Sequence, residues 1–307
     1  MSAASSLAVP NRKRTNPLKR SQARWGMLFA LPAVLIMAYF TVWPALQALY
    51  YSFTDWDGAT AHWVGLQNYV EGLLQSADFG QILLNNLFAI LSTPVGVAIA
   101  LLIAFKLSTG VHGTRLFRTL YFLPVVLSWV IIGLCWGYLL SSRGLVNSTM
   151  QSLGLGALTQ DWLGQPSTSM AMIIAVFNWG YLGMNVMLLY TGLMSIDNNV
   201  IEAARLDGAQ GFKLMRYIIL PHSRRYIELS LIITMSAAIT QLFGLIFTMT
   251  NGGPGVSSTT LEFSLYTTSF KNGNFAQGAA LGIVLFVLTL AFTVIRIRSG
   301  ARADDDE

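Results

Sequence analysis

Six long runs of apolar residues, almost free of charge, are the feature that most restricts the fold of this chain. Each run is about 20 residues or longer, which is the length that an α-helix needs to cross the hydrocarbon core of a bilayer. A backbone in lipid must satisfy its own hydrogen bonds, so such runs predict helices. The sequence therefore predicts an all-α membrane protein with six transmembrane helices, at residues 25–51, 82–105, 118–140, 170–193, 226–249 and 277–295.

The overall composition argues against a soluble domain. Of the 307 residues, 54% are hydrophobic and only 11% are charged, whereas about 25% of the residues of a soluble domain are charged. The one cysteine, Cys135, lies in an apolar run. It offers no disulfide framework and no zinc site, and we expect it to pack without reacting.

Lysine and arginine are distributed unevenly between the two sides of the predicted helices. With the N-terminus inside, all of the 19 basic residues except Arg143 and Lys271 lie on the inner side. Cytoplasmic segments carry an excess of Lys and Arg, so this distribution predicts that both termini are cytoplasmic. The net charge of +5 is then a consequence of topology, and we expect no nucleic-acid partner.

These features divide the chain into three parts. Residues 1–24 form a basic cytoplasmic tail, which we expect to be disordered or to lie along anionic lipid. Residues 25–297 form the six-helix transmembrane domain, and residues 298–307 form a cytoplasmic C-terminal tail. The predicted outer loops are 52–81, 141–169 and 250–276.

Ionisable groups are scarce inside the predicted helices, with Glu228 near the start of the fifth as the exception. Ion-coupled carriers and intramembrane hydrolases usually need such groups at depth, so both classes are disfavoured. His62, His112 and His222 lie far apart in loops and lack metal-ligand spacing. The sequence also lacks a GxxxxGK[ST] phosphate loop, so a partner would have to hydrolyse ATP. We therefore expect no catalytic residue, metal or cofactor in this chain.

Uncharged polar and aromatic side chains are present in the predicted helices instead. Amides, hydroxyls and rings can bind a neutral, hydroxyl-rich solute without burying a charge. They also join helices through hydrogen bonds, and both interpretations stay open at each position. The residues are Asn85, Asn86, Ser128, Trp129, Asn178, Trp179, Tyr181, Asn185, Thr234, Thr240 and Gln241.

A polar segment between the fourth and fifth apolar runs has the pattern of a small hairpin. Residues 200–206 contain two alanines and no helix breaker, and Gly208 suits the end of a helix. A second short helix would place Phe212, Met215 and Ile219 on one stripe. Two interpretations fit this pattern: a connector between two membrane helices, or an element that docks on a partner.

The spacing of this segment resembles the cytoplasmic coupling loop of permease subunits of ABC importers. That loop has the pattern Glu-Ala-Ala, two residues, Asp-Gly-Ala and, further on, Ile-x-Leu-Pro. The matching residues here are Glu202, Ala203, Ala204, Asp207, Gly208, Ala209, Ile218, Leu220 and Pro221. Two positions depart from the family: Met215 replaces a usual phenylalanine, and Asp197 a frequent proline. Both keep the expected chemistry, an apolar side chain and a helix start.

The resemblance extends over nearly the whole chain, to carbohydrate-importer permeases of the maltose and glycerol-phosphate type. Supporting stretches are YSFTDW at 51–56, VGLQNY at 64–69, FRTLYFLP at 117–124, GLVN at 144–147, DWL at 161–163 and TNGGP at 250–254. It implies a type I ABC-importer permease fold in a bacterial plasma (inner) membrane. The implied ATP and Mg bind to a separate ATPase subunit.

The resemblance also implies partners and site residues. The partners are a second permease subunit, two ATPase subunits, an extracytoplasmic solute-binding protein, the sugar substrate and membrane lipid. In a coupling loop at 195–225, the implied ATPase contacts are Glu202, Ala203, Ala204, Asp207, Gly208, Phe212 and Met215. The implied binding-protein contacts are Asn251, Gly252, Gly253 and Pro254. The expected substrate path contains Ser128, Phe177, Asn178, Tyr181, Thr234 and Gln241.

The expected function is therefore that of a permease subunit, not of an enzyme. With a second permease it would form the translocation path for a sugar or oligosaccharide. One alternative is another polar solute such as glycerol phosphate, although a phosphate favours fixed positive groups and the predicted helices have none. The alternative from a different class is a self-contained carrier or channel, which would need no ATPase.

Overall fold

The computed structural model describes residues 17–109 and 114–304, which divide into two units, one ending at Tyr50 and the other beginning at Tyr51. These described residues form helices and turns, with an isolated antiparallel bridge between Thr54 and Trp63. The predicted helical fold class is confirmed. The basic residues of the N-terminal tail before Pro17 lie outside the described residues, as do the last three residues of the C-terminal tail.

The first unit is a long apolar helix with a π-helical turn in its middle. It consists of α1 (Pro17–Met37), η1 (Ala38–Val42) and α2 (Trp43–Tyr51). The π-helical turn lies directly before Pro44, because the ring of a proline would clash with the carbonyl four residues earlier in a regular α-helix. Residues Gly26–Tyr51 are long and apolar enough to cross a membrane. Within this unit the side chains at 26–46 are all exposed, as expected for a helix that faces lipid.

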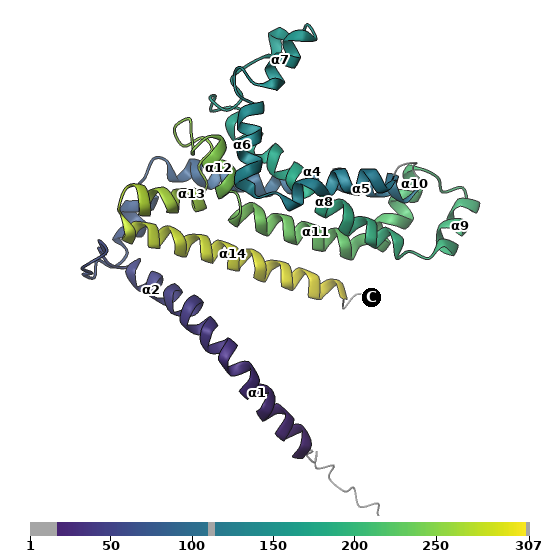
Figure 1. The fold of residues 1–307 in the computed structure, drawn as a ribbon. Helices are drawn as coiled ribbons and strands as arrows, with labels where there is room; N and C mark the ends of the chain where they lie inside the picture. Colours follow the sequence, from purple (N-terminus) through teal and green to yellow (C-terminus); the bar gives the residue numbers. More distant parts are fainter. Residues whose placement is uncertain (1–16, 110–113, 305–307) are drawn as a thin grey trace, which may run out of the picture. The chain divides into compact units, whose positions relative to one another are not determined.

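Long helices that run alongside one another form the body of the second unit (Figure 1). They are α4 (Phe79–Ser108), α8 (Ser169–Met194), α11 (Leu220–Thr240) and α14 (Phe275–Asp304). Glycines on α8 let its neighbours approach closely. A Cβ at Gly183 would overlap the carbonyl oxygen of Tyr121, and one at Gly192 would lie 2.5 Å from the ring of Tyr226. Small residues allow this close contact between apolar helices in lipid.

Two of the predicted spans are broken helices. Residues 118–140 become α5 (Thr114–Val126) and α6 (Trp129–Leu139), which meet at 109°. Residues 226–249 become α11 and α12 (Phe243–Met249), with a bend of 50°. The described chain thus contains four helices suited to crossing a membrane, or up to six if each bent pair is one span. Six continuous spans were expected, and the two breaks are the difference.

Shorter helices fill the connections. They are α3 (Gln67–Tyr69), η2 (Val70–Leu74), α7 (Leu145–Ser152), η3 (Gly156–Leu158), α9 (Asn198–Leu206), α10 (Phe212–Leu214), η4 (Met215–Ile219), α13 (Leu261–Tyr266) and η5 (Thr267–Lys271). The three helices from α9 to η4 lie at one end of the bundle, beyond the last residue of α8 (Figure 1). The opposite end of α8 contacts the 250–259 loop, where the Oγ atoms of Ser169 and Ser257 are 2.9 Å apart.

The buried side chains form three clusters along the bundle. The largest surrounds Phe177 and joins α6, α8, α11 and α12. A second joins the last turns of α4 and α8 to buried residues of the α9 to η4 segment. The third ties Leu73 of η2 and Leu261 of α13 to α14. The residues that follow the two breaks, Trp129 and Leu242, therefore lie in the largest cluster or pack against it.

Candidate functional site

The two helix breaks expose backbone that no longer follows an α-helix. Ser128 is extended, with ψ 143°, and α6 begins directly after it. Gln241 has φ −132° and separates α11 from α12. Non-helical backbone at membrane depth is tolerated only where protein buries it or a water-filled cavity adjoins it. Discontinuous helices also frame the binding sites of many transporters. The breaks therefore mark the candidate solute site.

Three aromatic rings from two helices stack beside these breaks. The ring centroid of Trp129 lies 5.6 Å from that of Phe177 and 5.4 Å from that of Tyr181, at interplanar angles of 24° and 25°. Offset stacking of this kind stabilises aromatic pairs beyond the area that they bury. Phe177 is fully buried and Tyr181 is 9% exposed. Phe177 is thus the fully buried ring against which the rings of Trp129 and Tyr181 pack.

Two glycines make room for the indole of Trp129. A Cβ at Gly180 of α8 would lie 2.5 Å from the Trp129 ring, and a Cβ at Gly244 of α12 would lie 3.0 Å from the Trp129 Cβ. The side chain of Trp129 is therefore enclosed between α8 and the first turn of α12. A larger residue at Gly180 would have to displace the indole.

A hydrogen bond joins the rings to the second helix break. The Tyr181 hydroxyl donates to Oε1 of Gln241 at 2.7 Å. Gln241 is exposed, and its amide nitrogen stays available as a donor. Ser128, Trp129, Phe177, Tyr181 and Gln241 together form what we call the aromatic-amide cluster. Its members carry no charge, so the groups it offers a solute are rings, an amide and hydroxyls.

Thr234 lies apart from this cluster. It is fully buried and donates to Oδ1 of Asn185 at 3.1 Å and to the carbonyl of Ser230 at 2.8 Å. Ser230 donates to the same Asn185 oxygen at 2.7 Å. These bonds join α8 to α11. Thr234 therefore has the helix-joining geometry that was one of its two interpretations.

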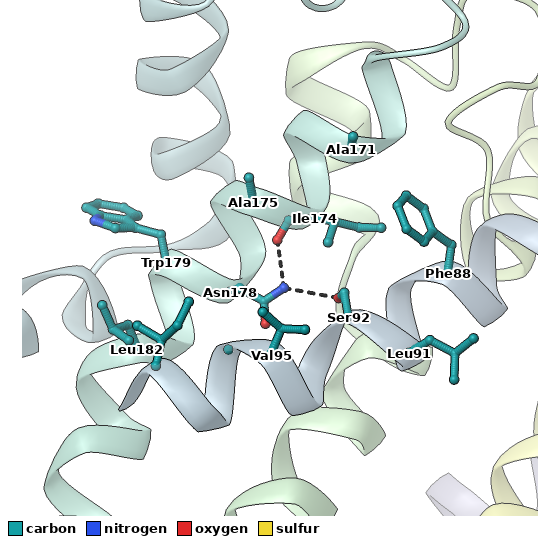
Figure 2. Close-up of a pocket in the computed structure, with 12 residues that line it drawn as sticks. Phe88, Leu91, Ser92, Val95, Ala171, Ile174, Ala175, Asn178, Trp179 and Leu182 are labelled. Atoms are coloured by element: carbon teal, nitrogen blue, oxygen red, sulfur yellow. Dashed lines mark hydrogen bonds between the residues drawn. The ribbon is translucent and has the colours of Figure 1, made fainter. Parts of the chain in front are cut away.

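Asn178 lies on another face of α8, in a groove of about 550 Å³ between α8 and α4 (Figure 2). Its amide nitrogen donates to Oγ of Ser92 at 3.1 Å and to the carbonyl of Ile174 at 3.0 Å. Its oxygen lies against Gly96, where a Cβ would overlap it. The remaining lining is mostly apolar, including Phe88. Of the six expected path residues, Thr234 and Asn178 are thus separate from the aromatic-amide cluster.

Glu262 is a partly buried carboxylate that no sequence pattern singled out. Its Oε2 accepts a hydrogen bond from the backbone N–H of Phe243, the first residue of α12, at 3.1 Å. It belongs to α13, outside the candidate spans. Burial raises the pKa of its carboxyl to about 7, against the opposing effect of the N–H groups of Phe243 and Leu242. An isolated acid in the stretch TTLEFSLY was the signal that could have indicated it.

The coupling hairpin, residues 195–225, begins and ends its first helix with standard caps. Asp197 accepts from the backbone N–H of Asn199 at 2.9 Å and starts α9. Gly208 has φ 84°. The N–H of Ala209 donates to the carbonyl of Ala204 at 2.9 Å, and that of Gly208 to the carbonyl of Arg205 at 3.1 Å. This is the Schellman pattern, which favours glycine at the left-handed position.

The predicted apolar stripe of the second hairpin helix is only partly formed. Phe212 is 78% exposed, but Met215 is only 7% exposed and packs with Ile219 on the ends of α4 and α8. The helix changes from α to π geometry at Met215, which rotates the following residues away from the direction of Phe212. Of the predicted stripe, Phe212 is therefore exposed, whereas Met215 and Ile219 are buried. Ala204 is buried in the same cluster.

The remaining expected ATPase contacts lie on the hairpin surface. Glu202, Ala203, Asp207 and Gly208 are exposed. Leu206, which was not selected, is 90% exposed and adds a large apolar side chain to this surface.

The turn at Asn251 and Gly252 is held by side chains from several segments. Both residues have positive φ, 52° and 88°. The hydroxyl of Thr259 donates to the carbonyl of Gly252 at 3.0 Å, and Lys271 donates to Oδ1 of Asn251 at 2.8 Å. Gly252 is buried, whereas Asn251 is exposed and Gly253 and Pro254 are partly buried. Asn251 is thus the most accessible of the four residues that were expected to contact a binding protein.

Comparison with solved structures identifies the fold. The chain superimposes on a chain of a bacterial ABC transporter involved in the import of the acidic polysaccharide alginate, with a TM-score of 0.77 over 94% of this chain and 99% of that chain at 23% identity. A structure of the alginate transporter in complex with an alginate-pentasaccharide-bound periplasmic protein gives 0.76 over 95% and 98%, also at 23% identity. The type I ABC permease fold follows from this likeness.

The family follows from the sequence comparison. Residues 92–299 match the family of binding-protein-dependent transport system inner membrane components, and the chain belongs to this family. It is a multi-pass inner membrane permease, and the resemblance found in its motifs is confirmed.

Three relatives cover nearly all of the chain. A probable ABC transporter permease of Pyrococcus horikoshii is 33% identical over 86% of this chain and 91% of its own length. The multiple sugar-binding transport system permease MsmF of Streptococcus mutans is 29% identical over 89% and 94%. The sn-glycerol-3-phosphate permease UgpA of Escherichia coli O157:H7 is 30% identical over 92% and 96%.

Proposed function

We propose that this chain is one of two permease subunits of an ATP-driven importer for a sugar or oligosaccharide. The comparisons support a sugar as the solute. The relative MsmF is named for multiple sugars, and the similar solved structures are of an importer of the polysaccharide alginate. The observation that carries the proposal is the aromatic-amide cluster at the two helix breaks. It combines stacked rings with an exposed amide and has no charge.

The chemistry of the cluster suits a neutral sugar. A sugar ring has an apolar face of C–H groups, which can pack on Trp129, and hydroxyls, which can exchange water for the amide of Gln241 and the hydroxyls of Ser128 and Tyr181. Each such exchange contributes about 0.5–1.5 kcal/mol. The solute would therefore bind weakly enough to be released on the other side.

The coupling hairpin is the proposed contact with an ATPase subunit. Its exposed surface presents Glu202, Ala203 and Asp207 beside the large apolar side chains of Leu206 and Phe212. A short helix with one apolar surface suits a groove on a partner. The buried side chains of the hairpin continue into α4 and α8, so a movement of the docked hairpin would move the bundle. ATP and Mg would bind to the two ATPase subunits.

The proposal also includes the side of the membrane on which each end of the bundle lies. The positive-inside distribution supports cytoplasmic termini and a cytoplasmic hairpin. The 250–259 loop contacts the other end of α8, so its turn with Asn251, Gly252, Gly253 and Pro254 would face an extracytoplasmic binding protein. The complete path would form between this chain and the second permease.

The direct test measures solute-stimulated ATP hydrolysis by the complex reconstituted with its ATPases and binding protein. We expect neutral sugars to stimulate hydrolysis, and Tyr181→Phe, which breaks the bond to Gln241, to raise the half-saturating sugar concentration by about three- to tenfold. Tyr138→Phe is the matched control, because Tyr138 is exposed on α6. Failure of all sugars to stimulate the complex would refute the proposal.

Glycerol phosphate is the second candidate, because UgpA relatives align over nearly the whole chain. A phosphate group favours Arg or Lys at its site, and the aromatic-amide cluster contains neither. We expect glycerol phosphate to stimulate hydrolysis less than sugars do. A self-contained carrier or channel would instead give solute flux through the purified chain in vesicles without ATP, and we expect none.

A further inference from the structure

A carboxylate outside the aromatic-amide cluster is hydrogen-bonded next to the break between α11 and α12. This break positions Gln241, a member of the cluster. Glu262 accepts the N–H of Phe243, only two residues after Gln241. The first N–H groups of any helix lack intrahelical partners, and a break in a span creates such groups inside the protein. Leu242 and Phe263, which flank the bonded pair, are each 1% exposed, and Glu262 is partly buried, so the hydrogen bond lies in a partly desolvated environment.

The first turn of α12 is enclosed from two sides. Gly244 faces the Trp129 backbone and Cβ, while Phe243 is bonded to Glu262. Trp129 in turn stacks on Tyr181, which bonds to Gln241. A displacement of this turn would therefore change the positions of Gln241 and the indole together.

No basic side chain compensates Glu262 among the described residues that pack on it. Its helix α13 packs against η5, α12, α14 and α4. The α12 segment has no ionisable residue. Lys271 of η5 bonds to Asn251 and lies over the Phe263 ring. The other groups on these elements are Tyr266 on α13, Lys106 near the far end of α4, and Arg296, Arg298, Arg302 and Asp304 near the far end of α14.

We propose that Glu262 is a positioning residue that fixes the break between α11 and α12, and that its ionisation state sets the affinity of the path for its neutral solute. Ionised, the carboxylate has only acceptor sites and suits the N–H groups of Leu242 and Phe243. Protonated, it keeps a carbonyl oxygen that accepts an N–H group more weakly, and it gains a hydroxyl donor that these N–H groups cannot accept. This inference deepens the proposed function and rests on it.

Both forms of the side chain exist near neutral pH. Burial raises the pKa of Glu262 to about 7, so the carboxylate predominates above that pH and the acid below it. The affinity for solute should then rise with pH as the turn of α12 becomes fixed.

The test is the pH dependence of half-saturation in the complete reconstituted complex. In the wild type we expect the half-saturating sugar concentration to fall about three- to tenfold between about pH 6 and pH 8, with little change in maximal rate. Glu262→Gln should keep the low-pH value throughout, because its amide cannot ionise. Glu71→Gln, an exposed acid of η2, should behave like the wild type.

The outcomes separate this inference from the proposed function. A wild-type pH response in Glu262→Gln would overturn the positioning role while leaving sugar transport intact, whereas a complex that no sugar stimulates would overturn the function itself. Membrane content and melting temperature show whether the variant folds. If it does not, Glu262→Asp makes the same comparison: it is too short to reach Phe243, and an unchanged half-saturating concentration would contradict the proposal.

Discussion

At the residue scale, the indole of Trp129 fits against α8 because residue 180 is glycine and has no Cβ. A methyl group there would lie 2.5 Å from the ring, so Gly180→Ala must displace Trp129. We expect a loss of about 1–3 kcal/mol in stability and a solute affinity at least about tenfold lower. The control is Gly137→Ala on α6, where a Cβ would make ordinary contact at 3.7 Å. Equal half-saturation in the two variants would show that the Trp129 position is irrelevant to solute.

Glu262 also makes the stability of the chain depend on pH. Its pKa rises from 4.5 to about 7 on folding, so the folded chain retains a proton that the unfolded chain releases. The stabilising contribution is complete below about pH 4.5 and is lost as pH rises through 7.

We therefore expect the free energy of unfolding to fall by up to about 3 kcal/mol across this window. Thermal melting of the purified protein at several pH values measures the fall, and Glu262→Gln should reduce it. Parallel curves for wild type and variant would exclude this group as the cause.

At the scale of elements, substitutions of Gly208 at the end of α9 can distinguish an effect on folding from an effect on docking. Gly208 has φ 84° and open space where its Cβ would lie. Gly208→Asn should be tolerated, because asparagine adopts this conformation readily. Gly208→Trp should still insert into the membrane but uncouple ATP hydrolysis from uptake, because the indole would obstruct the proposed ATPase groove. Normal uptake by Gly208→Trp would remove Gly208 from the docking surface.

Alanine substitutions at two apolar residues of the second hairpin helix should have opposite effects on stability and on coupled uptake. Phe212 is exposed and Met215 is buried. Phe212→Ala should leave the melting temperature unchanged and weaken coupled uptake, whereas Met215→Ala should cost about 2–5 kcal/mol of stability. Melting and uptake measured on both variants provide the comparison. A destabilised Phe212→Ala with normal coupling would contradict the exposed docking role.

The breaks in the spans show why sequence patterns predicted elements better than sites. Hydropathy indicated residues 118–140 and 226–249 correctly as apolar, but hydropathy does not record where a helix bends. The helix turn that follows the bend at Gln241 is hydrogen-bonded to Glu262, which lies in a different segment. The stripe through Phe212, Met215 and Ile219 likewise did not show which of its members are buried, because that depends on packing against α4 and α8.

At the scale of the whole molecule, the largest exposed apolar surfaces define what the chain needs around it. The side chains at 26–46 are exposed within the first unit, and the outward side of α4 in the second unit is similarly apolar. Lipid and neighbouring subunits can satisfy both. An inner membrane permease of this family is consistent with this requirement.

The sequence by itself determined that the chain is helical and membrane-embedded, because a bilayer leaves long apolar segments no other way to satisfy their backbone. Motif spacing likewise identified the family and predicts the coupling role of the hairpin, because both motifs are local features. Only the tertiary structure shows that Trp129 and Gln241 both contact Tyr181, whereas Thr234 bonds to Asn185 and Asn178 to Ser92. The rotation of each helix and the position of its break depend on contacts between segments far apart in the sequence.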